Sequence, residues 1–326
     1  MFKRLRGVLA AACFSALAVT PLVVQAQSAN NNYPNRTITF VVPYPAGGAT
    51  DTLARMLAQK MSEAWKVPVM VDNRAGAGGT IGNNYVVKAE PNGYTVLIGI
   101  TALVQQLHVM DLPYTALTDL APVMRIASSP SILAVPPSIP ANSVQELVAL
   151  IKANPEKHSY GSFGQGTTSH FQGAAFALQE NLDIVHVPYK GGAPLVAALM
   201  GDQVTLGFLD AGSSRAQLPK FKLLGVSGEN RLSWLPDVPT LKEQGLKNYE
   251  PLGWFGMFMP AGTPKAIQEK FAKEASRILA EPEVTKRVQD LGLIVGGETL
   301  GDFGQILKND TEVWGKIVKD AKITLQ

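Results

Sequence analysis

The feature that most constrains the fold is a regular alternation of strand-like and helical patterns along the chain. The apolar run "TITFVVP" at 37–43 is typical of a buried strand, and residues 51–65 then carry apolar side chains at helical spacing. Strand-like runs follow at 67–71 and 94–100, with a glycine-rich loop and a short helical segment between them. This order predicts a parallel sheet with right-handed crossovers.

A second series of the same kind fills the middle of the chain. Strand-like runs recur, mostly with helical runs between them, at 131–136, 158–162, 183–189, 204–210 and 222–227. The sequence "VPYPAGGATDTLARML" from Val42 is echoed by "VPYKGGAPLVAALM" from Val187. The echo is either a coincidence of common turns or a sign of two related lobes. After Tyr249 the pattern changes to one apolar strand and three helical segments.

The first 26 residues have the pattern of an export signal. Lys3, Arg4 and Arg6 precede an apolar stretch that ends in small residues suited to cleavage. A membrane anchor is the alternative, but Pro21 interrupts the stretch and no charged stop-transfer sequence follows. We therefore expect a periplasmic protein whose signal peptide, residues 1–26, is cleaved after Ala26.

Removal of this segment changes what the charge and the cysteine content imply. The 29 Lys and Arg residues fall to 26, which equals the 26 Asp and Glu residues, so the mature chain is formally neutral. A neutral chain gives no case for nucleic acid binding. Cys13 is the only cysteine and is also removed, which excludes disulfides, a thiolate nucleophile and a cysteine metal site.

Glycine-rich corners stand before predicted helices in four segments, "PAGGATD" at 45–51, "AGAGGTIG" at 75–82, "GSFGQGTTSH" at 161–170 and "YKGGAP" at 189–194. A helix start leaves backbone N–H groups without intrahelical partners, and glycine lets a ligand reach them. Such corners favour an anion site at the carboxyl ends of parallel strands. The plainer alternative is tight turns, with Ser and Thr acting as helix caps.

Several kinds of chemistry are excluded by missing motifs. The chain contains no P-loop, no G-x-G-x-x-G, no G-x-S-x-G elbow and no H-E-x-x-H. His170 follows a cluster of hydroxyls, but no spaced acid completes a triad, so a histidine that hydrogen-bonds at a helix start is favoured. We expect no catalytic residue, no metal and no cofactor, and an anion bound by N–H groups and hydroxyls.

Motifs along nearly the whole mature chain resemble those of one family. They include "ITFVVPYPAGGATDTLAR", "YGSFGQGTTSH", "VPYKGGAPLVAALMGDQV" and "GWFGMFMPAGTP". The chain is similar to the Bug family, the extracytoplasmic substrate-binding receptors of tripartite tricarboxylate transporters. The resemblance implies the α/β type II periplasmic binding protein fold, with two lobes joined by a hinge and a ligand cleft between them. Lobe 1 would comprise 27–127 plus 250–326, and lobe 2 would comprise 128–249.

The resemblance also implies which residues bind the ligand. The first glycine loop would bind one end, partly through ordered waters, with Tyr44, Ala46, Gly47, Gly48 and Asp51, and with Thr101 nearby. The loop of the second lobe would hold a carboxylate through backbone N–H groups and hydroxyls of Ser162, Gly164, Gln165, Gly166, Thr167 and Thr168, with His170 beside them. Tyr189, Gly191 and Gly192 would face the same cleft.

Residues after Phe208 depart from the pattern of the family, because "PKF" replaces a Lys-Ala-Gly turn. Asp210 is retained and could accept a hydrogen bond from a ligand amine, or it could cap the helix that follows. Arg215 could reach a second carboxylate, although a solvated helix face is favoured.

The favoured function is a periplasmic receptor that captures a small carboxylate, which could be a di- or tricarboxylate, an acidic amino acid or an aromatic acid. Its partners would be the membrane permease subunits of a tripartite tricarboxylate transporter, and the receptor itself would be a monomer. Alternatives are a subunit that presents the ligand to a membrane sensor, or an enzyme on the same scaffold with Asp210 or His170 as a base.

Overall fold

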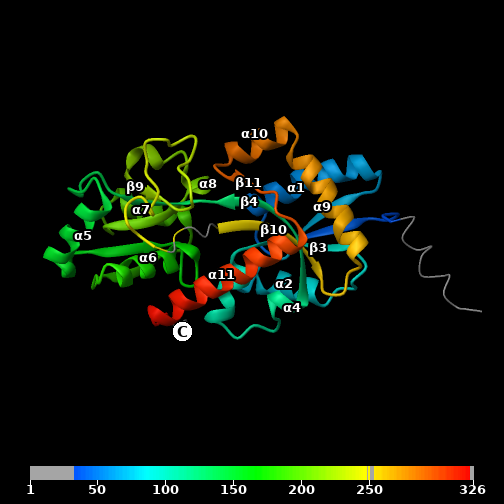
Figure 1. The fold of residues 1–326 in the computed structure, drawn as a ribbon, viewed down its shortest axis with the longest axis horizontal. Helices are drawn as coiled ribbons and strands as arrows, with labels where there is room; N and C mark the ends of the chain where they lie inside the picture. Colours follow the sequence, from blue (N-terminus) through cyan, green and yellow to red (C-terminus); the bar gives the residue numbers. More distant parts are fainter. Residues whose placement is uncertain (1–32, 248, 250–252, 324–326) are drawn as a thin grey trace, which may run out of the picture. The chain divides into compact units, whose positions relative to one another are not determined.

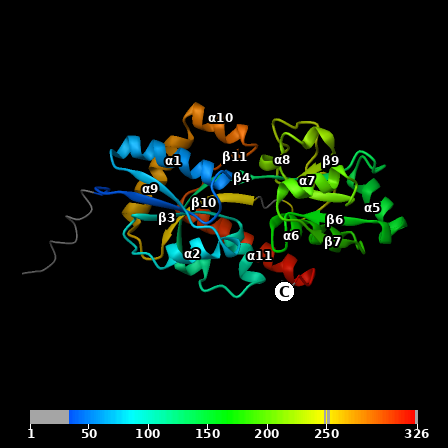
Figure 2. The same ribbon diagram turned by 180° about the vertical axis from the view of Figure 1, so that it is seen from behind.

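The structure is a computed structural model that describes residues 33–247, 249 and 253–323. The expected signal peptide lies outside the described residues. All elements below belong to the unit that begins at Arg36. They form two mixed sheets, each covered by helices (Figures 1 and 2), which confirms the predicted α/β class with two lobes.

The first sheet has the strand order β11-β4-β10-β3-β1-β2. Its strands are β1 (Ile38–Val42), β2 (Val69–Asn73), β3 (Thr95–Ile100), β4 (Leu120–Ser129), β10 (Gly253–Pro260) and β11 (Ile294–Val295). The helices of this half are α1 (Ala49–Trp65), α2 (Thr80–Val87), α3 (Ala102–Gln105), α4 (Ala116–Asp119), α9 (Lys265–Leu279), α10 (Pro282–Asp290) and α11 (Leu300–Asp320), with short 3-10 turns at Ala77–Gly79 and Gln106–His108.

The second sheet has the strand order β7-β6-β8-β5-β9. Its strands are β5 (Ser131–Val135), β6 (Ser159–Ser162), β7 (Val185–Pro188), β8 (Leu206–Asp210) and β9 (Lys222–Val226). The helices are α5 (Val144–Ala153), α6 (Thr168–Gln179), α7 (Gly192–Met200) and α8 (Ala211–Ser214), with 3-10 turns at Pro155–Lys157 and Leu218–Lys220.

Each sheet combines three parallel strands with antiparallel additions. Strand β1 pairs in parallel with β2 and β3, and β6 pairs in parallel with β7 and β8, as the alternating patterns predict. Strand β10 runs antiparallel to β3 and β4, and β5 runs antiparallel to β8 and β9. Only Pro130 separates β4 of the first sheet from β5 of the second. The predicted lobe boundaries at 127 and 250 stay a prediction.

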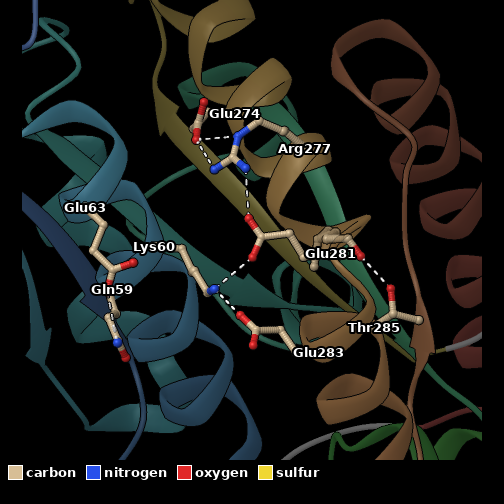
Figure 3. Close-up of polar contacts among 9 residues, drawn as sticks. Gln59, Lys60, Glu63, Glu274, Arg277, Glu281, Glu283 and Thr285 are labelled. Carbon is tan, nitrogen blue, oxygen red and sulfur yellow. Dashed lines mark hydrogen bonds and ion pairs between the residues drawn. The ribbon is translucent and has the colours of Figure 1, made fainter.

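An ion-pair network ties α1 to the corner between α9 and α10 (Figure 3). The ammonium of Lys60 on α1 pairs with the carboxylates of Glu281 and Glu283. The other oxygen of Glu281 pairs with Arg277 at 2.8 Å, and Arg277 also pairs with Glu274 at 2.7 Å. An isolated ion pair at the surface contributes little, but here several charges, some of them half-buried, form one network that joins α1 to this corner.

Helix α6 lies directly on strand β6 because a glycine faces the strand. A Cβ built at Gly173 would come within 2.3 Å of the ring of Tyr160. Phe171, on the same helix, packs against Trp314 of α11 with ring centroids 5.9 Å apart. Helix α11 therefore contacts α6 as well as β4 of the first sheet (Figures 1 and 2).

We predict that Gly173→Ala destabilises the protein although alanine is the better helix former. Overpacking against Tyr160 should lower the free energy of unfolding by about 1–3 kcal/mol. The matched control is Gly301→Ala in α11, where a Cβ would meet nothing within 4 Å, and it should raise that energy by up to about 1 kcal/mol. Urea unfolding followed by circular dichroism measures both, and equal effects at the two positions would contradict the packing argument.

Candidate functional site

A cavity of about 410 Å³ is lined by elements of both sheets. The first half of the fold contributes Tyr44, Gly78, Ile100, Thr101, Ala102, Gln105, Gln106, Ser129, Gly253, Trp254 and Phe255. The second half contributes Ser131, Phe163, Gln165, Gly166, Thr167, Thr168 and Asp210. These lining residues include no Lys, Arg or His, and Asp210 is the one with a formal charge. The described lining residues are therefore polar and aromatic, and none of them is basic.

The loop 162–168 enters helix α6 and bonds mainly to itself. The hydroxyl of Ser162 bonds to the backbone of Gly164, and the hydroxyl of Thr167 donates to Gly164 O at 2.7 Å. The N–H of Gly166 donates to Nδ1 of His170 at 3.2 Å. Among the described residues, the N–H groups of Gln165, Thr167 and Thr168 have no hydrogen-bond partner, and all three residues line the cavity.

A side-chain contact joins the two halves of the fold at the cavity. The amide of Gln105, which is 1% exposed at the end of α3, bonds to the hydroxyl of Thr168 at the start of α6. The Thr168 hydroxyl oxygen lies 2.9 Å from Gln105 Nε2 and 3.2 Å from Gln105 Oε1. Next to it, Gln106 Nε2 donates to Gly78 O at 3.0 Å. These two glutamines fix the wall that the first half presents to Thr168.

The first glycine loop is organised by Asp51 rather than presented to the cavity. One carboxylate oxygen of Asp51 accepts from Gly47 N–H and from Arg55 Nε, each at 2.9 Å, and the other accepts from Asn73 at 3.0 Å. The bond from Arg55, together with those from Gly47 and Asn73, outweighs burial and lowers the pKa of Asp51 to about 2. The loop's Ala46, Gly47 and Gly48 are exposed, and none of them lines the cavity.

Tyr44, just before this loop, does line the cavity. Burial raises the pKa of its phenol, which stays protonated. A Cβ at Gly79 would come within 2.8 Å of the Tyr44 hydroxyl, so the glycine there permits close packing of the ring.

Thr101 and Trp254 meet at the floor of the cavity. The N–H of Trp254 donates to the Thr101 hydroxyl at 2.6 Å, and Thr101 N–H donates to Trp254 O at 3.2 Å. The indole of Trp254 donates to Asp310 of α11 at 2.8 Å, and burial raises the pKa of that carboxyl to about 6. Thr101 therefore holds β10 in place at the cavity, with its hydroxyl already engaged.

Asp210 ends strand β8 and faces the cavity across from β4. It accepts a hydrogen bond from the hydroxyl of Ser129. Arg215 does not line this cavity; it lies over the ring of Trp234 at 4.6 Å and donates to Gln289 O.

Of the residues predicted from sequence, seven line the cavity, namely Tyr44, Thr101, Gln165, Gly166, Thr167, Thr168 and Asp210. The others lie outside the lining set, namely Ala46, Gly47, Gly48, Asp51, Ser162, Gly164, His170, Tyr189, Gly191 and Gly192. Several of these support the loop, since Tyr189 N–H bonds to Ser162 O and Gly191 N–H bonds to Phe163 O. Sequence reasoning missed Gln105, Gln106, Ser129 and the aromatic residues of β10, which carry no glycine or motif signal.

No described helix combines the length and the apolar character that a membrane span requires. Across the described part of the chain, His, Cys, Asp and Glu side chains nowhere gather in a group of three or more suited to a metal ion.

Two mixed α/β sheets with a cavity lined from both place the chain in the class of the periplasmic binding proteins, because the structure of periplasmic binding protein BugD matches with a TM-score of 0.74 and 32% identity, over 90% of this chain and 100% of that chain. A structure described as R. palustris Rpa4515 with adipate matches with a TM-score of 0.79 and 32% identity, over 90% of this chain and 100% of that chain. MatC (Rpa3494) from Rhodopseudomonas palustris with bound malate matches with a TM-score of 0.74 and 28% identity, over 88% and 100%.

The sequence comparisons identify the family. The model for the tripartite tricarboxylate transporter family receptor matches residues 53–323, and the chain belongs to this family. The UPF0065 protein in the tcbD-tcbE intergenic region of Pseudomonas sp. strain P51 is 37% identical over 313 residues, 94% of this chain and 93% of that protein. Protein BugT of Bordetella pertussis is 32% identical over 279 residues, which cover 78% of this chain and 86% of that protein. The chain is thus a solute-binding receptor and not an enzyme.

We predict that Asp51→Asn destabilises the protein in a pH-dependent way. At pH 6 the loss of the charged acceptor for Arg55 and Gly47 should lower the free energy of unfolding by about 1–3 kcal/mol. Because the pKa of Asp51 is lowered in the folded state, its contribution is present above the unfolded value near 4 and is lost as the pH falls towards about 2.

Urea unfolding at pH 6 and pH 3 measures the free energy of unfolding of wild type and of Asp51→Asn. The difference between the two free energies should be smaller at pH 3 than at pH 6. Asp302→Asn, at an exposed position in the first turn of α11, is the matched control. A difference that stays constant between the two pH values would contradict this role of Asp51.

Proposed function

We propose that this protein is exported to the periplasm, with cleavage after Ala26, and captures a small carboxylate there for a tripartite tricarboxylate transporter. Membership of the receptor family supports this, as do the relatives whose structures are described with adipate and with malate. The receptor acts as a monomer and delivers its ligand to membrane permease subunits. The ligand is a di- or tricarboxylate, an acidic amino acid or an aromatic acid.

The observation that carries the proposal is a set of three unpartnered N–H groups where the loop 162–168 enters α6. Those of Gln165, Thr167 and Thr168 belong to lining residues of the cavity, whose described lining includes no basic side chain. The helix dipole adds a partial positive charge at this end, which attracts an anion. Hydrogen bonds to a charged acceptor contribute about 1.5–3 kcal/mol each, so a few such bonds suit binding near the micromolar range. A carboxylate is an acceptor of the right size and charge.

The remaining walls suit the body of such a ligand. Ile100, Phe163, Trp254 and Phe255 offer apolar surface, while the amide of Gln105 and the hydroxyls of the lining residues offer polar contacts. Ordered waters would connect the far end of the ligand to the loop 44–51, whose own glycines lie outside the lining set.

Contacts to both halves would couple binding to closure. The bond between Gln105 and Thr168 joins the first half to the second beside the N–H groups. A ligand that touches both walls favours the closed arrangement, in which this bond forms. A hinge between the halves would allow an open arrangement, in which the bond is broken. The permease would then distinguish loaded from empty receptor.

The proposal is tested by titrating purified mature protein with a panel of mono-, di- and tricarboxylates. Trp254 lines the cavity, so binding should change the tryptophan fluorescence, and calorimetry should give a saturable isotherm for at least one acid. Mass spectrometry of ligand that copurifies with the protein would name the acid. If no member of the panel binds, and nothing copurifies, the receptor function proposed here is wrong.

We predict that Thr168→Pro weakens carboxylate binding more than Thr168→Ala does. Thr168 is the first residue of α6 after an extended Thr167, so proline fits the helix there but removes the N–H donor. Both variants lose the hydroxyl, and only proline loses the N–H. The difference should be about tenfold to a hundredfold in Kd, measured by calorimetry. Equal affinities of the two variants would show that this N–H does not bind the ligand.

A further inference from the structure

Two histidines stack face to face behind the loop that borders the cavity. The rings of His170 on α6 and His186 on β7 are 3.9 Å apart and inclined by only 8°. Tyr160 of β6 stacks on His186 at 4.8 Å. Neither histidine lines the cavity, so neither is placed to contact a ligand there.

Each imidazole bonds to one side of the loop 162–168. His170 Nδ1 accepts the Gly166 N–H at 3.2 Å, and His186 Nε2 lies 2.7 Å from the Ser162 hydroxyl. Gly166 itself lines the cavity, between Gln165 and Thr167. The two histidines thus contact the loop at Ser162, where it begins, and at Gly166, which lies between the unpartnered N–H groups of Gln165 and Thr167.

The hydrogen bonds define the tautomers. Because Nδ1 of His170 is an acceptor, the proton of the neutral ring is on Nε2. The Ser162 hydroxyl has one proton, and when it donates to Gly164 O it must accept from His186, which then carries its proton on Nε2. Protonation of His170 would therefore put a donor opposite the Gly166 N–H, and protonation of both rings would stack two cations.

We infer that His170 and His186, whose imidazoles are stacked, are positioning residues. They hold the loop 162–168 in its binding conformation while both rings are neutral. This inference rests on the proposed function for its meaning, but it concerns a contact that can be measured without ligand. Burial, and then the charge of His186, lower the pKa of His170 to about 4, and burial lowers that of His186 to about 4.

The surroundings of the pair contain little that would stabilise a charged ring. The groups that face it are the Tyr160 ring and the Ser162 hydroxyl from β6, and Phe171 from α6. Among the described residues, no carboxylate shifts the pKa of either histidine. Since unfolded histidines titrate near 6.5, the unfolded state binds more protons between pH 6.5 and 4, and stability falls as the pH falls through that window.

The first test asks whether the loop needs the hydrogen-bond acceptor of His170 or only its imidazole ring. His170→Leu removes the acceptor for Gly166, whereas His170→Asn keeps a carbonyl oxygen near the place of Nδ1 and does not titrate. With adipate and malate as probes at pH 7, we expect His170→Leu to weaken binding by about tenfold or more and His170→Asn to restore most of the loss. His158→Asn, at a histidine bonded to Thr205 instead, is the matched control and should bind as wild type does.

The second test needs no ligand and covers a leucine variant that fails to fold. The amide signal of Gly166 in wild-type NMR spectra should shift with the titration of His170 towards pH 4, and the shift should be absent in His170→Asn. The folding equilibrium constant of wild type should also drop at least about tenfold more than that of His170→Asn between pH 7 and 4.5.

A Gly166 signal that ignores His170, or full affinity in a folded His170→Leu variant, would overturn the inference. If neither adipate nor malate, nor any acid of the wider panel, binds to wild type, the proposed function fails. The Gly166 titration then still decides whether the imidazole holds the loop.

Discussion

The site depends on how the polar groups of the turn 162–168 satisfy one another. A buried donor or acceptor without a partner costs free energy, and the groups of this turn that are buried, such as the Ser162 hydroxyl and the Gly166 N–H, are paired. The Ser162 and Thr167 hydroxyls both bond to Gly164, and His170 takes the N–H of Gly166. What remains for a ligand is a small set of donors at the cavity. The same pairing that stabilises the turn therefore orients its binding groups in advance.

The sequence predicts the strands, the helices and the parallel pairing of the two sheets well, because these depend on hydrophobic periodicity and on the order of elements along the chain. The alternating patterns indicate the parallel sets β1–β2–β3 and β6–β7–β8. The glycine corner with most hydroxyls, at 161–170, is the one that contributes most of the second half's wall. Glycine and hydroxyl residues before a helix are a local signal, and the local geometry they predict is found there.

The sequence could not show which N–H groups of the other corners are already engaged. The N–H of Gly47 bonds to Asp51, and that of Gly191 bonds to Phe163 O. Both glycines have left-handed backbone angles, with φ of 88° and 103°, which explains the residue type without a ligand. A glycine pattern alone does not separate a turn that needs this conformation from one that must admit a ligand. Gln105 and Ser129 reach the cavity through tertiary pairing, which leaves no local pattern.

The absence of basic side chains among the lining residues has a consequence for release as well as for capture. An ion pair with Arg or Lys in a closed cavity would hold an anion strongly, whereas backbone dipoles and hydroxyls bind it through short-range, directional bonds. Such bonds weaken steeply when the two walls separate by even a small distance. In the proposed receptor, opening at the bond between Gln105 and Thr168 would therefore suffice to lower the affinity. Asp210, which lines the cavity from the second half as Thr168 does, carries a formal negative charge. The placement of the donors rather than the net charge of the cavity must therefore select the ligand.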